Sequence, residues 1–319
     1  MMKTGNLLLT GVALCLAVPA WSDVICSLQG SPTLDFGNVD PFTGGNVLTQ
    51  VTVNWSCTRG FFESTQNTMC VHLGNDNNGG MLPRRMVANS NQPPLIPFNV
   101  YTTAARVEVV GQPGGATNVG IPINVNMPFF GNRTDSGTVT LYGLLPGPLP
   151  GTTRAEFHQA LMTNSQVRVR EGGFNQSCSA GAGAITDNYT LTAQVNIPDQ
   201  CQVSATDLDF GTRNTPLAQV DSTSTVTVRC TNTTDFDVGL NGGLNGNRQM
   251  SNGTDQVDYE LYQDAGRSVL WGNMPGTLQS GIGLGTGSAQ NLTVYGRVFP
   301  DPSAEAGSYS DTVTVEVTF

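Results

Sequence analysis

Basic residues, histidine and long apolar runs are all scarce in this chain. Lysine and arginine together number 14 against 24 acidic residues, the formal net charge is −10, and lysine is almost absent. Nucleic acids and anionic membranes are bound by clustered basic residues, so the composition argues against both kinds of partner. Beyond residue 22 no stretch approaches the roughly 18 uninterrupted apolar residues that a membrane-spanning helix needs.

The first 22 residues have the pattern of a secretory signal peptide. Lys3 gives a positive start, residues 7–20 are nearly all apolar, and Ala20-Trp21-Ser22 is a small-x-small cleavage site. We expect the mature chain to begin at Asp23, to be soluble and to be exported. Its remaining length predicts two domains of roughly 100 to 200 residues each.

Residue patterns typical of catalytic and metal sites are also missing. His72 and His158 are the only histidines and no C-x-x-C pair exists, which argues against zinc and against a hydrolase triad. GNDNNGG at 74–80 offers calcium a single carboxylate, Asp76, and GIGLGTG at 281–287 lacks the lysine of a phosphate-binding loop. We therefore predict a protein that is not an enzyme and binds no metal or cofactor.

The chain does contain an internal sequence repeat of two copies. LDFG occurs at 34–37 and again at 208–211, following Cys26 and Cys201 at nearly the same distance. The other matched blocks are collinear: VTVNWSC at 51–57 with VTVRC at 226–230, FNVYTTAAR at 98–106 with YELYQDAGR at 259–267, GIPI at 120–123 with GIGL at 281–284, TVTLYGLLP at 138–146 with NLTVYGRVFP at 291–300, and ITDNYTLTAQVNI at 185–197 with YSDTVTVEVTF at 309–319. We predict one domain over 23–197 and a second over 198–319.

Nearly every matched block alternates apolar and polar residues, with Gly, Asn, Asp or Pro between the blocks. Period two with such punctuation predicts half-buried antiparallel strands, and so an all-β chain of two tandem β-sandwiches. Asp35 and Asp209 recur in both copies, so we expect LDFG to form a turn and not a carboxylate pair for glycoside chemistry.

Six cysteines remain beyond the signal peptide, and an even number in a secreted chain favours disulfides. The equivalent cysteines of the two copies predict the pairs Cys26–Cys57 and Cys201–Cys230. Cys70 and Cys178 occur only in the first copy and most simply pair with each other. Closing so long a loop contributes about 4 to 5 kcal/mol in the chain-entropy model.

Four motifs resemble the spore coat protein U domain family: C-x7-LDFG, V-T-V-x-C, Y-x-L-Y-x-D and the ending G-x-Y-x-D-x-V-x-V-x-V-x-F. The resemblance covers residues 201–319 closely and 26–197 more loosely. It implies pilin-type immunoglobulin-like domains of an archaic chaperone–usher system, and a two-copy chain resembles the tip adhesin of such a pilus. The second domain is then an incomplete sandwich, completed by a donor strand from the next pilin.

The same resemblance implies the partners and the location. These are a periplasmic pilus chaperone and an outer-membrane usher, with export through the periplasm to the pilus tip at the cell surface. Residues 309–319 are the expected assembly strand, and the alternation points Val313, Val315, Val317 and Phe319 inward. Only Asp23, Val24 and Ile25 precede Cys26, whereas a strand needs about five or six residues, so we expect this subunit to accept a strand and not donate one.

The first copy carries longer connections that are rich in proline and apolar residues, such as NMPFF at 126–130. Apolar residues held on loops are typical of interaction surfaces, so these loops predict attachment to a hydrophobic abiotic or host surface and biofilm formation. The candidate residues are Met127, Pro128, Phe129, Phe130, Leu149, Met81, Leu82, Leu95 and Ile96.

Two sets of alternatives stay open at this point. Phe129 and Phe130 could instead close the end of the first sandwich, and Phe61 and Phe62 could pack on Trp55 if Cys70 draws their loop inward. A carbohydrate-binding lectin on a pilus, or a structural surface coat protein, would have a similar sequence. A shallow concavity with polar and aromatic residues would favour the lectin, and a protruding apolar cluster would favour the adhesin.

Overall fold

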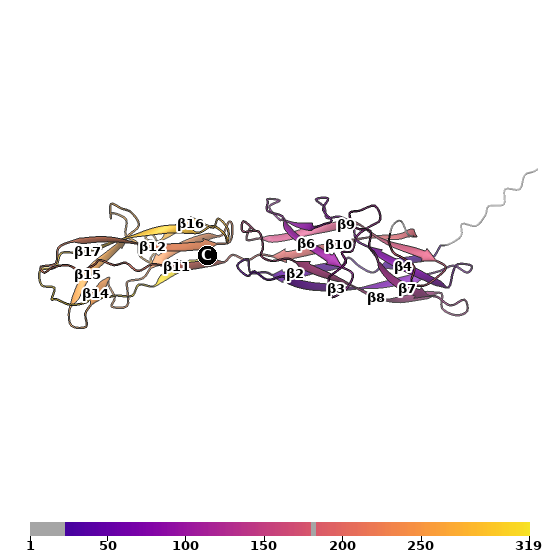
Figure 1. Ribbon diagram of the computed structural model, residues 1–319, viewed down its shortest axis with the longest axis horizontal. Coiled ribbons are helices and arrows are strands. Elements are labelled where there is room, and N and C mark those ends of the chain that lie inside the picture. The colour runs from indigo at the N-terminus through magenta and orange to yellow at the C-terminus, as the bar shows by residue number, and fades with distance from the viewer. Residues whose placement is uncertain (1–22, 180–182) are drawn as a thin grey trace, which may run out of the picture.

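The computed structural model describes residues 23–179 and 183–319, and every regular element in those ranges is a β-strand. The all-β prediction is confirmed, and within these ranges no helix is long and apolar enough to cross a membrane. The predicted signal peptide at 1–22 lies outside the described residues. Figure 1 shows two bodies arranged end to end, with the earlier strands in one and the later strands in the other.

The first body is a sandwich made from one sheet that folds back on itself. Its strands are β1 (Ile25–Leu28), β2 (Thr33–Asn38), β3 (Val47–Thr58), β4 (Gln66–His72), β5 (Arg84–Ala88), β6 (Ile96–Tyr101), β7 (Ile121–Asn126), β8 (Thr134–Leu145), β9 (Phe157–Glu171) and β10 (Ala184–Asn196). They are hydrogen-bonded in the order β1-β3-β8-β6-β5-β9-β10-β2, and β4 joins β9 to β7.

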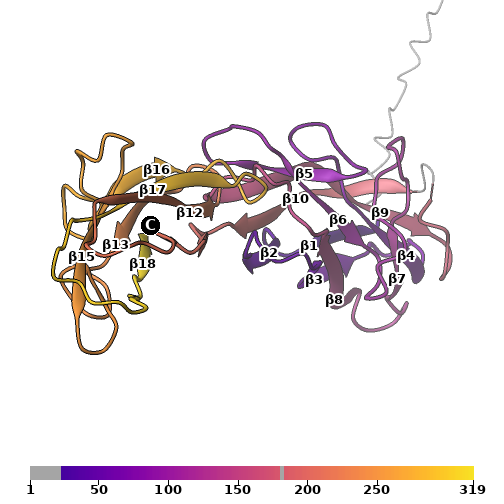
Figure 2. The same ribbon diagram turned by 60° about the vertical axis from the view of Figure 1, so that its left-hand side comes forward.

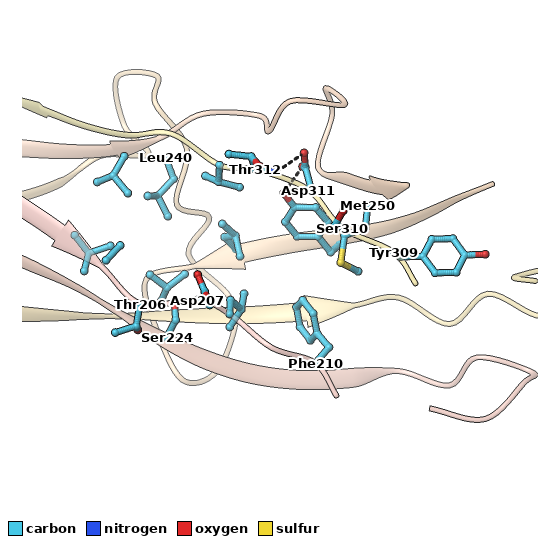
Figure 3. Close-up of a pocket in the computed structure, with 18 residues that line it drawn as sticks. Thr206, Asp207, Phe210, Ser224, Leu240, Met250, Tyr309, Ser310, Asp311 and Thr312 are labelled. Atoms are coloured by element: carbon cyan, nitrogen blue, oxygen red, sulfur yellow. Dashed lines mark hydrogen bonds between the residues drawn. The ribbon is translucent and has the colours of Figure 1, made fainter. Parts of the chain in front are cut away.

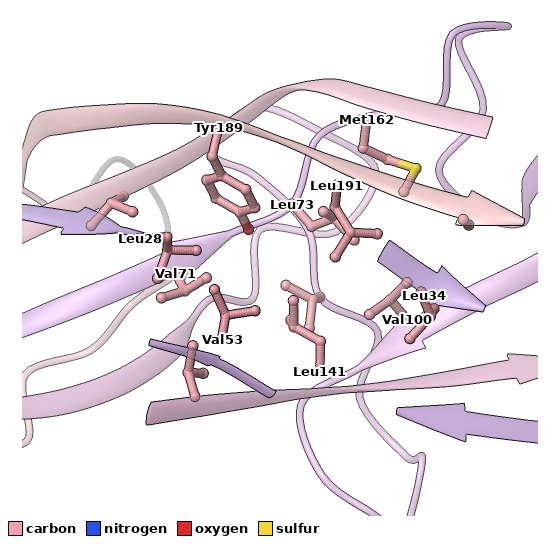
Figure 4. Packing of buried hydrophobic residues seen from close by; sticks show 14 of the residues in the cluster. Leu28, Leu34, Val53, Val71, Leu73, Val100, Leu141, Met162, Tyr189 and Leu191 are labelled. Atoms are coloured by element: carbon pink, nitrogen blue, oxygen red, sulfur yellow. The ribbon is translucent and has the colours of Figure 1, made fainter. Parts of the chain in front are cut away.

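The core of the first body lies between the two faces of that folded sheet. In Figure 4, Val53 and Leu141 face Met162 and Leu191 across it. On β10, every second residue from Tyr189 to Val195 is buried, as period-two alternation requires. The alternation in the sequence therefore determines which side of each strand packs inward.

The second body has two separate sheets. Its strands are β11 (Cys201–Ala205), β12 (Val220–Cys230), β13 (Asp235–Leu240), β14 (Gln249–Ser251), β15 (Gln256–Tyr262), β16 (Gln279–Ile282), β17 (Gln290–Val298) and β18 (Val315–Thr318). One sheet has the order β11-β12-β17-β15-β14 and the other β16-β13-β18. The core around the fully buried Trp271 holds residues from both sheets. The change of core and sheets supports our proposed boundary near Pro198.

The repeat extends to individual hydrogen bonds. The Asp35 carboxylate accepts from the Gly37 amide at 2.8 Å, and Asp209 accepts from Gly211 at 2.7 Å, so LDFG makes the same local hydrogen bond in both copies. It does not reverse the chain, because residues 34–37 lie within β2 and residues 208–211 are assigned no turn, so the predicted turn is wrong. Both glycines have a positive φ, +72° and +70°, which explains why glycine stands there.

Two buried arginines are repeated as well. Arg84 donates to the carbonyls of Leu73 and Val110, and Arg248 donates to those of Leu240 and Trp271. Burial lowers the pKa of Arg84 to about 10. These side chains satisfy backbone carbonyls inside each sandwich and are structural in both copies.

One part of the predicted repeat alignment is wrong. β4 and β13 are counterparts, because each pairs with the strand of the matched GIPI and GIGL blocks, β7 and β16. On its other side β4 pairs with β9, whereas β13 pairs with β18. The counterpart of the C-terminal strand is therefore β9 and not residues 185–197, which form the additional strand β10. Sequence matching chose β10 because both segments alternate in the same way.

β10 completes the first sandwich from within the chain. It runs antiparallel to β9 along its length and parallel to β2, pairing Ala193 with Leu34. In the second body β18 pairs with β13 alone, and among the described residues no strand takes the place of β10 on its other side.

The three predicted disulfides are present: Cys26–Cys57, Cys70–Cys178 and Cys201–Cys230. The first and third link directly opposed residues of adjacent strands, β1 with β3 and β11 with β12. The second ties β4 to the connection between β9 and β10. The disulfide found only in the first copy thus holds the segment that leads into the strand found only in the first copy.

The two bodies meet through hydrogen bonds and close backbone packing, which together we call the joint. The Ala155 amide donates to the Asn232 carbonyl at 3.0 Å, and the Asn232 side chain donates to the Thr152 carbonyl at 2.9 Å. Gly285 packs so closely that an added Cβ would lie 2.1 Å from the Gly151 carbonyl oxygen. Figure 2 shows the same joint from another side, with β10 leading directly into the second body.

Candidate functional site

The pole of the first body opposite the joint carries four phenylalanines, Phe61, Phe62, Phe129 and Phe130, which we call the aromatic tip. β8 is 12 residues long, or roughly 40 Å at 3.3 Å per residue. Its last residue leads into the joint, so the loop before its first residue lies at the far end. In Figure 1, β4 and β7, whose ends bear these loops, are at the end of the molecule away from the second body.

The four rings form a continuous chain of edge-to-face contacts. Ring centroids are 5.0 Å apart for Phe61 and Phe62, 5.3 Å for Phe61 and Phe129, and 5.1 Å for Phe129 and Phe130. These are favourable geometries for aromatic pairs. The outer rings remain largely in solvent, 76% for Phe62 and 87% for Phe130. The result is a protruding apolar cluster that the two loops build jointly.

Two arginines flank the rings. Arg133 is exposed, and its guanidinium lies 4.6 Å from the centroid of Phe61. Arg59 is buried beneath the cluster, 5.8 Å from the centroid of Phe129. Both distances are within the range of cation–π attraction.

Several predicted surface residues are instead part of the core, and for them the prediction is wrong. Met127, Met81, Ile96 and Leu149 are all buried. Met127 continues the inward alternation of Val125 on β7, and Ile96 begins the inward alternation of β6. The Met81 side chain packs against Gly115 and Thr117. A neighbouring proline did not indicate exposure, because Met127 and Ile96 keep the period of the adjoining strand and Met81 is covered by a neighbouring loop.

The remaining candidates do not share one surface. Pro128, Phe129 and Phe130 are exposed at the tip, while Leu82 is exposed beside a cavity lined by Asn75 and Arg85. Leu95 is half-buried. It lies on the β5–β6 connection, whose Ser90 hydrogen-bonds Glu156 at the joint end. Leu149 is at the joint as well, so the candidate surface reduces to the aromatic tip.

Phe61 and Phe62 were not among the predicted surface residues, because a bond at Cys70 could have drawn their loop inward. Cys70 does bind Cys178, but it sits well inside β4, after Gln66, so the loop before that strand is free to project. The doublet FF beside glycine in both loops was the signal that the two segments are alike.

The second body has an open groove at the place where β10 closes the first. Leu208 and Phe210, the counterparts of Leu34 and Phe36, belong to no strand. They line a cavity of about 400 Å³ together with Leu240, Met250 and Val313. Figure 3 shows this cavity extending between Leu240 at one end and Tyr309 at the other. We call it the acceptor groove.

The predicted assembly strand lies along this groove. Val313, Val315 and Val317 are half-buried against the core, as the alternation predicts, while Phe319 is 57% exposed and does not point inward. The regular strand is limited to Val315–Thr318, so Phe319 lies beyond its last hydrogen-bonded residue. Valines on the final strand of a complete sandwich would be fully buried, as on β9, so their half-burial is a consequence of the open groove.

Two tyrosines fix the segment that leads into β18. The Tyr259 hydroxyl donates to Asp311 at 2.6 Å, and the Tyr309 hydroxyl donates to Asp255 at 2.7 Å. Desolvation, followed by the bond to Asp255, raises the pKa of Tyr309 to about 12. The open edge is therefore held in place although no strand covers it.

The side chains considered for catalysis or metal binding have structural partners in the described residues. His72 and His158 are fully buried and bond backbone carbonyls, of Gly111 and Arg154 respectively. Burial lowers the pKa of both imidazoles. Across residues 23–179 and 183–319 no group of three or more His, Cys, Asp or Glu side chains could hold a metal ion. Asp76 accepts the amides of Asn78, Gly80 and Arg85 and so organises its own loop.

Known proteins with a similar sequence or structure agree with this arrangement. Protein U of Myxococcus xanthus is 32% identical over 159 residues, which is 43% of this chain and 88% of that protein. The solved complex of CsuC and CsuE, a chaperone and tip adhesion subunit from archaic chaperone-usher Csu pili of Acinetobacter baumannii, has a TM-score of 0.53 at 17% identity. That match covers 92% of this chain and 100% of the solved chain, and at such an identity it shows a shared fold.

The Spore Coat Protein U domain matches the chain twice, at residues 13–157 and 187–316. The two matches correspond to the two copies of the repeat and together span well over half of the sequence. The chain therefore belongs to the spore coat protein U domain family.

Proposed function

We propose that this protein is the tip adhesin of an archaic chaperone–usher pilus, attaching cells to hydrophobic surfaces in biofilm formation. The first body carries the adhesive surface, and the second connects it to the fibre. The observation that carries the proposal is the asymmetry between two copies of one fold. One is closed by its own strand β10 and bears exposed phenylalanines, and the other is open along β18.

The groove supports the assembly half of the proposal. An open sheet edge beside an apolar cavity fits β-augmentation, in which an extended segment adds main-chain hydrogen bonds and alternate side chains fill pockets. Within the secretory pathway a periplasmic chaperone would occupy the groove, and in the fibre the next pilin would, after transfer at an outer-membrane usher. An uncovered groove would otherwise promote aggregation.

The direction of the donor strand follows from β10. β10 runs antiparallel to β9 and parallel to β2, so a donor in the second body would run antiparallel to β18. β18 itself runs toward the joint, since its Thr318 pairs with Asp237 near Asn232. The donor would leave the groove at the end away from the joint. The next subunit would then extend from the pole opposite the phenylalanines, which leaves the aromatic tip at the end of the fibre.

The adhesive half rests on the aromatic tip. Most of the surface of Phe130 and Phe62 lies in solvent, so both rings can pass from water to an apolar surface. Removing one such ring from water contributes about 1.5 to 3 kcal/mol, and many fibres on one cell multiply the effect. A protruding apolar cluster of this kind favours the adhesin over the lectin alternative.

Substituting the exposed rings tests this function. Replacing Phe129 and Phe130 by Ser should leave export and stability nearly unchanged, because exposed substitutions usually cost no more than about 0.5 kcal/mol. Adhesion of cells to hydrophobic plastic, divided by the amount of displayed subunit, should fall by at least an order of magnitude for each 1.4 kcal/mol of binding lost.

Two control variants separate binding from folding. Leu244→Ser removes a side chain that is 81% exposed on the second body, so it should leave adhesion unchanged. Met127→Ser removes a buried side chain of the tip loop and should cost about 2 to 5 kcal/mol, which would reduce display. Normal adhesion per displayed subunit in the double phenylalanine variant would exclude the aromatic tip as the binding surface.

A further inference from the structure

Arg59 lies under the aromatic tip and joins its two loops. The guanidinium Nε donates to the Met127 carbonyl at 2.7 Å and NH2 donates to the Pro128 carbonyl at 2.6 Å. On the other side, NH1 donates to the carbonyls of Gly60 at 2.9 Å and Phe61 at 3.4 Å. One planar group therefore holds the backbone on which both phenylalanine pairs stand.

All of these bonds are made to carbonyls and none to a carboxylate. Among the ion pairs of the described residues, Arg59 does not occur. The side chain is nevertheless buried, and a buried cation is costly unless hydrogen bonds replace its hydration. The fork of N–H groups in a guanidinium suits several carbonyls in fixed directions, which an ammonium group cannot match.

We propose that Arg59 is the positioning residue of the adhesive tip: it fixes the 60–62 loop against the 127–130 loop, so that four phenylalanines form one surface. This inference rests on the proposed adhesive function. Without Arg59, four carbonyls at the edge of the sandwich lose their donors and can be hydrated only if the loops separate. The contact between Phe61 and Phe129, which connects the two pairs of rings, would then be lost.

The second copy supports the assignment by contrast. Asn232 stands two residues after Cys230, as Arg59 stands two residues after Cys57. There the same end of the fold is covered by the joint, and Asn232 bonds Thr152 and Ala155 of the neighbouring body. An arginine clamp occurs where this end of the sandwich faces solvent and has to organise its own loops.

The test compares Arg59→Met and Arg59→Lys with a matched control, Arg106→Met. Arg106 also donates to backbone carbonyls, of Gly143, Ala104 and Thr49, and lies 5.8 Å from the Tyr142 ring centroid, but it is remote from the tip. For each full-length variant, adhesion to hydrophobic plastic per displayed subunit, melting temperature and amide hydrogen exchange of the two loops are measured.

Adhesion of both Arg59 variants should fall about tenfold or more, a loss of binding free energy smaller than that of burying one phenylalanine ring. The amides of the 60–64 and 127–133 segments should exchange faster. Arg106→Met should lower the melting temperature at least as much while keeping adhesion. The Lys variant retains the charge, so a loss of adhesion in it would show that the fork geometry of the guanidinium is required. If the Met variant is too unstable to be displayed, adhesion of the Lys variant alone tests the proposal.

Full adhesion in Arg59→Lys, or an adhesion loss equal to that of Arg106→Met, would overturn the positioning role. If the Phe129 and Phe130 substitutions also left adhesion intact, the proposed function itself would fail. If adhesion were lost in the phenylalanine variants but not in the Arg59 variants, only the positioning role of Arg59 would be rejected.

Discussion

Met127 and Phe129 are two residues apart and lie in opposite environments. Met127 is the last residue that keeps the inward alternation of β7, and its amide still donates to the Thr65 carbonyl at 2.8 Å. Pro128 then interrupts main-chain donation, and the next two side chains project. The proline alone does not locate this change in the sequence, because exposure depends on where the last hydrogen bond of the strand falls.

The buried histidines give the first body a defined response to acid. Burial lowers the pKa of His72 and His158 below 6.5, the ordinary value, so the folded state favours the neutral imidazoles. Their contribution to stability is fully present above pH 6.5 and decreases as the pH falls below it, because the unfolded chain then binds protons that the folded chain does not.

We therefore predict that the thermal transition of the first body shifts to lower temperature between pH 7.5 and pH 5. Each 1 kcal/mol of lost stability corresponds to about 2 to 4 °C for a domain of this size. Calorimetry of the full chain measures the shift. The second body contains neither histidine and serves as the internal control in the same scan. Equal shifts of both transitions would contradict the assignment.

At the scale of strands, the sequence predicted which segments form strands more reliably than which strands of the two copies are equivalent. The alternation identified β3, β8, β12 and β17, because it is a local pattern. The counterpart of β18 was missed because β9 and β10 have equally good alternation, and only pairing with β4 distinguishes them. Strand pairing is non-local, so a single sequence does not contain it.

The same limit applies to the candidate site. The apolar doublet at Phe129 and Phe130 was visible, but its meeting with Phe61 depends on Arg59, whose carbonyl partners are far apart in sequence. Phe319 ends a run of inward valines, yet pairing with β13 stops at Thr318 and leaves the last ring in solvent. In both cases hydrogen bonds across the fold decided the position of the ring.

The extra strand leads to a test by transplantation. Residues 172–197, with Cys178 changed to Ser, would be appended after Phe319, so that the β10 sequence can reach the acceptor groove. Leu191, Ala193 and Val195 are fully buried in the first body and should fill the equivalent sites. We predict a higher melting temperature for the second body, less aggregation and weaker binding to the periplasmic chaperone.

A matched graft controls for added length. In it, Leu191, Ala193 and Val195 are replaced by Asn, which keeps the main-chain hydrogen bonds but not the apolar filling. Burial of the two larger side chains is worth about 1.5 to 3 kcal/mol each, so the two grafts should differ clearly in stability. Identical melting curves would argue that the groove does not accept a strand in this direction.

For the whole molecule, the joint and the aromatic tip are the same end of the same fold. The loop between β16 and β17 corresponds to the loop between β7 and β8. In the second body it contains Gly285, packed on Gly151, where the first body has phenylalanines. The two domains of this chain thus stack head to tail, and its free end is the one that carries large side chains.

Substitution at Gly285 should loosen this stacking. Gly285 has a φ of +110°, so Gly285→Ala combines backbone strain with a collision against Gly151. Gly276→Ala is the matched control, because Gly276 has a φ of +90° but open space around it. Small-angle scattering should show a broader distribution of shapes only for the Gly285 variant. If both variants scattered as a rigid rod, the other contacts of the joint would be sufficient to hold the two bodies in place.

The path of the chain through β10 determines how the molecule bears tension. A pull between the aromatic tip and the fibre enters the first body at the end of β10, directly after the joint. β10 lies between β9 and β2 and is hydrogen-bonded to both, roughly along the long axis of the molecule (Figure 1). Such a load acts on these ladders in shear, so many bonds must yield together before the strand slips. On the proposed function, the strand that makes the first body independent of a donor would thus also be the part that resists extraction when an attached cell is pulled away by flow.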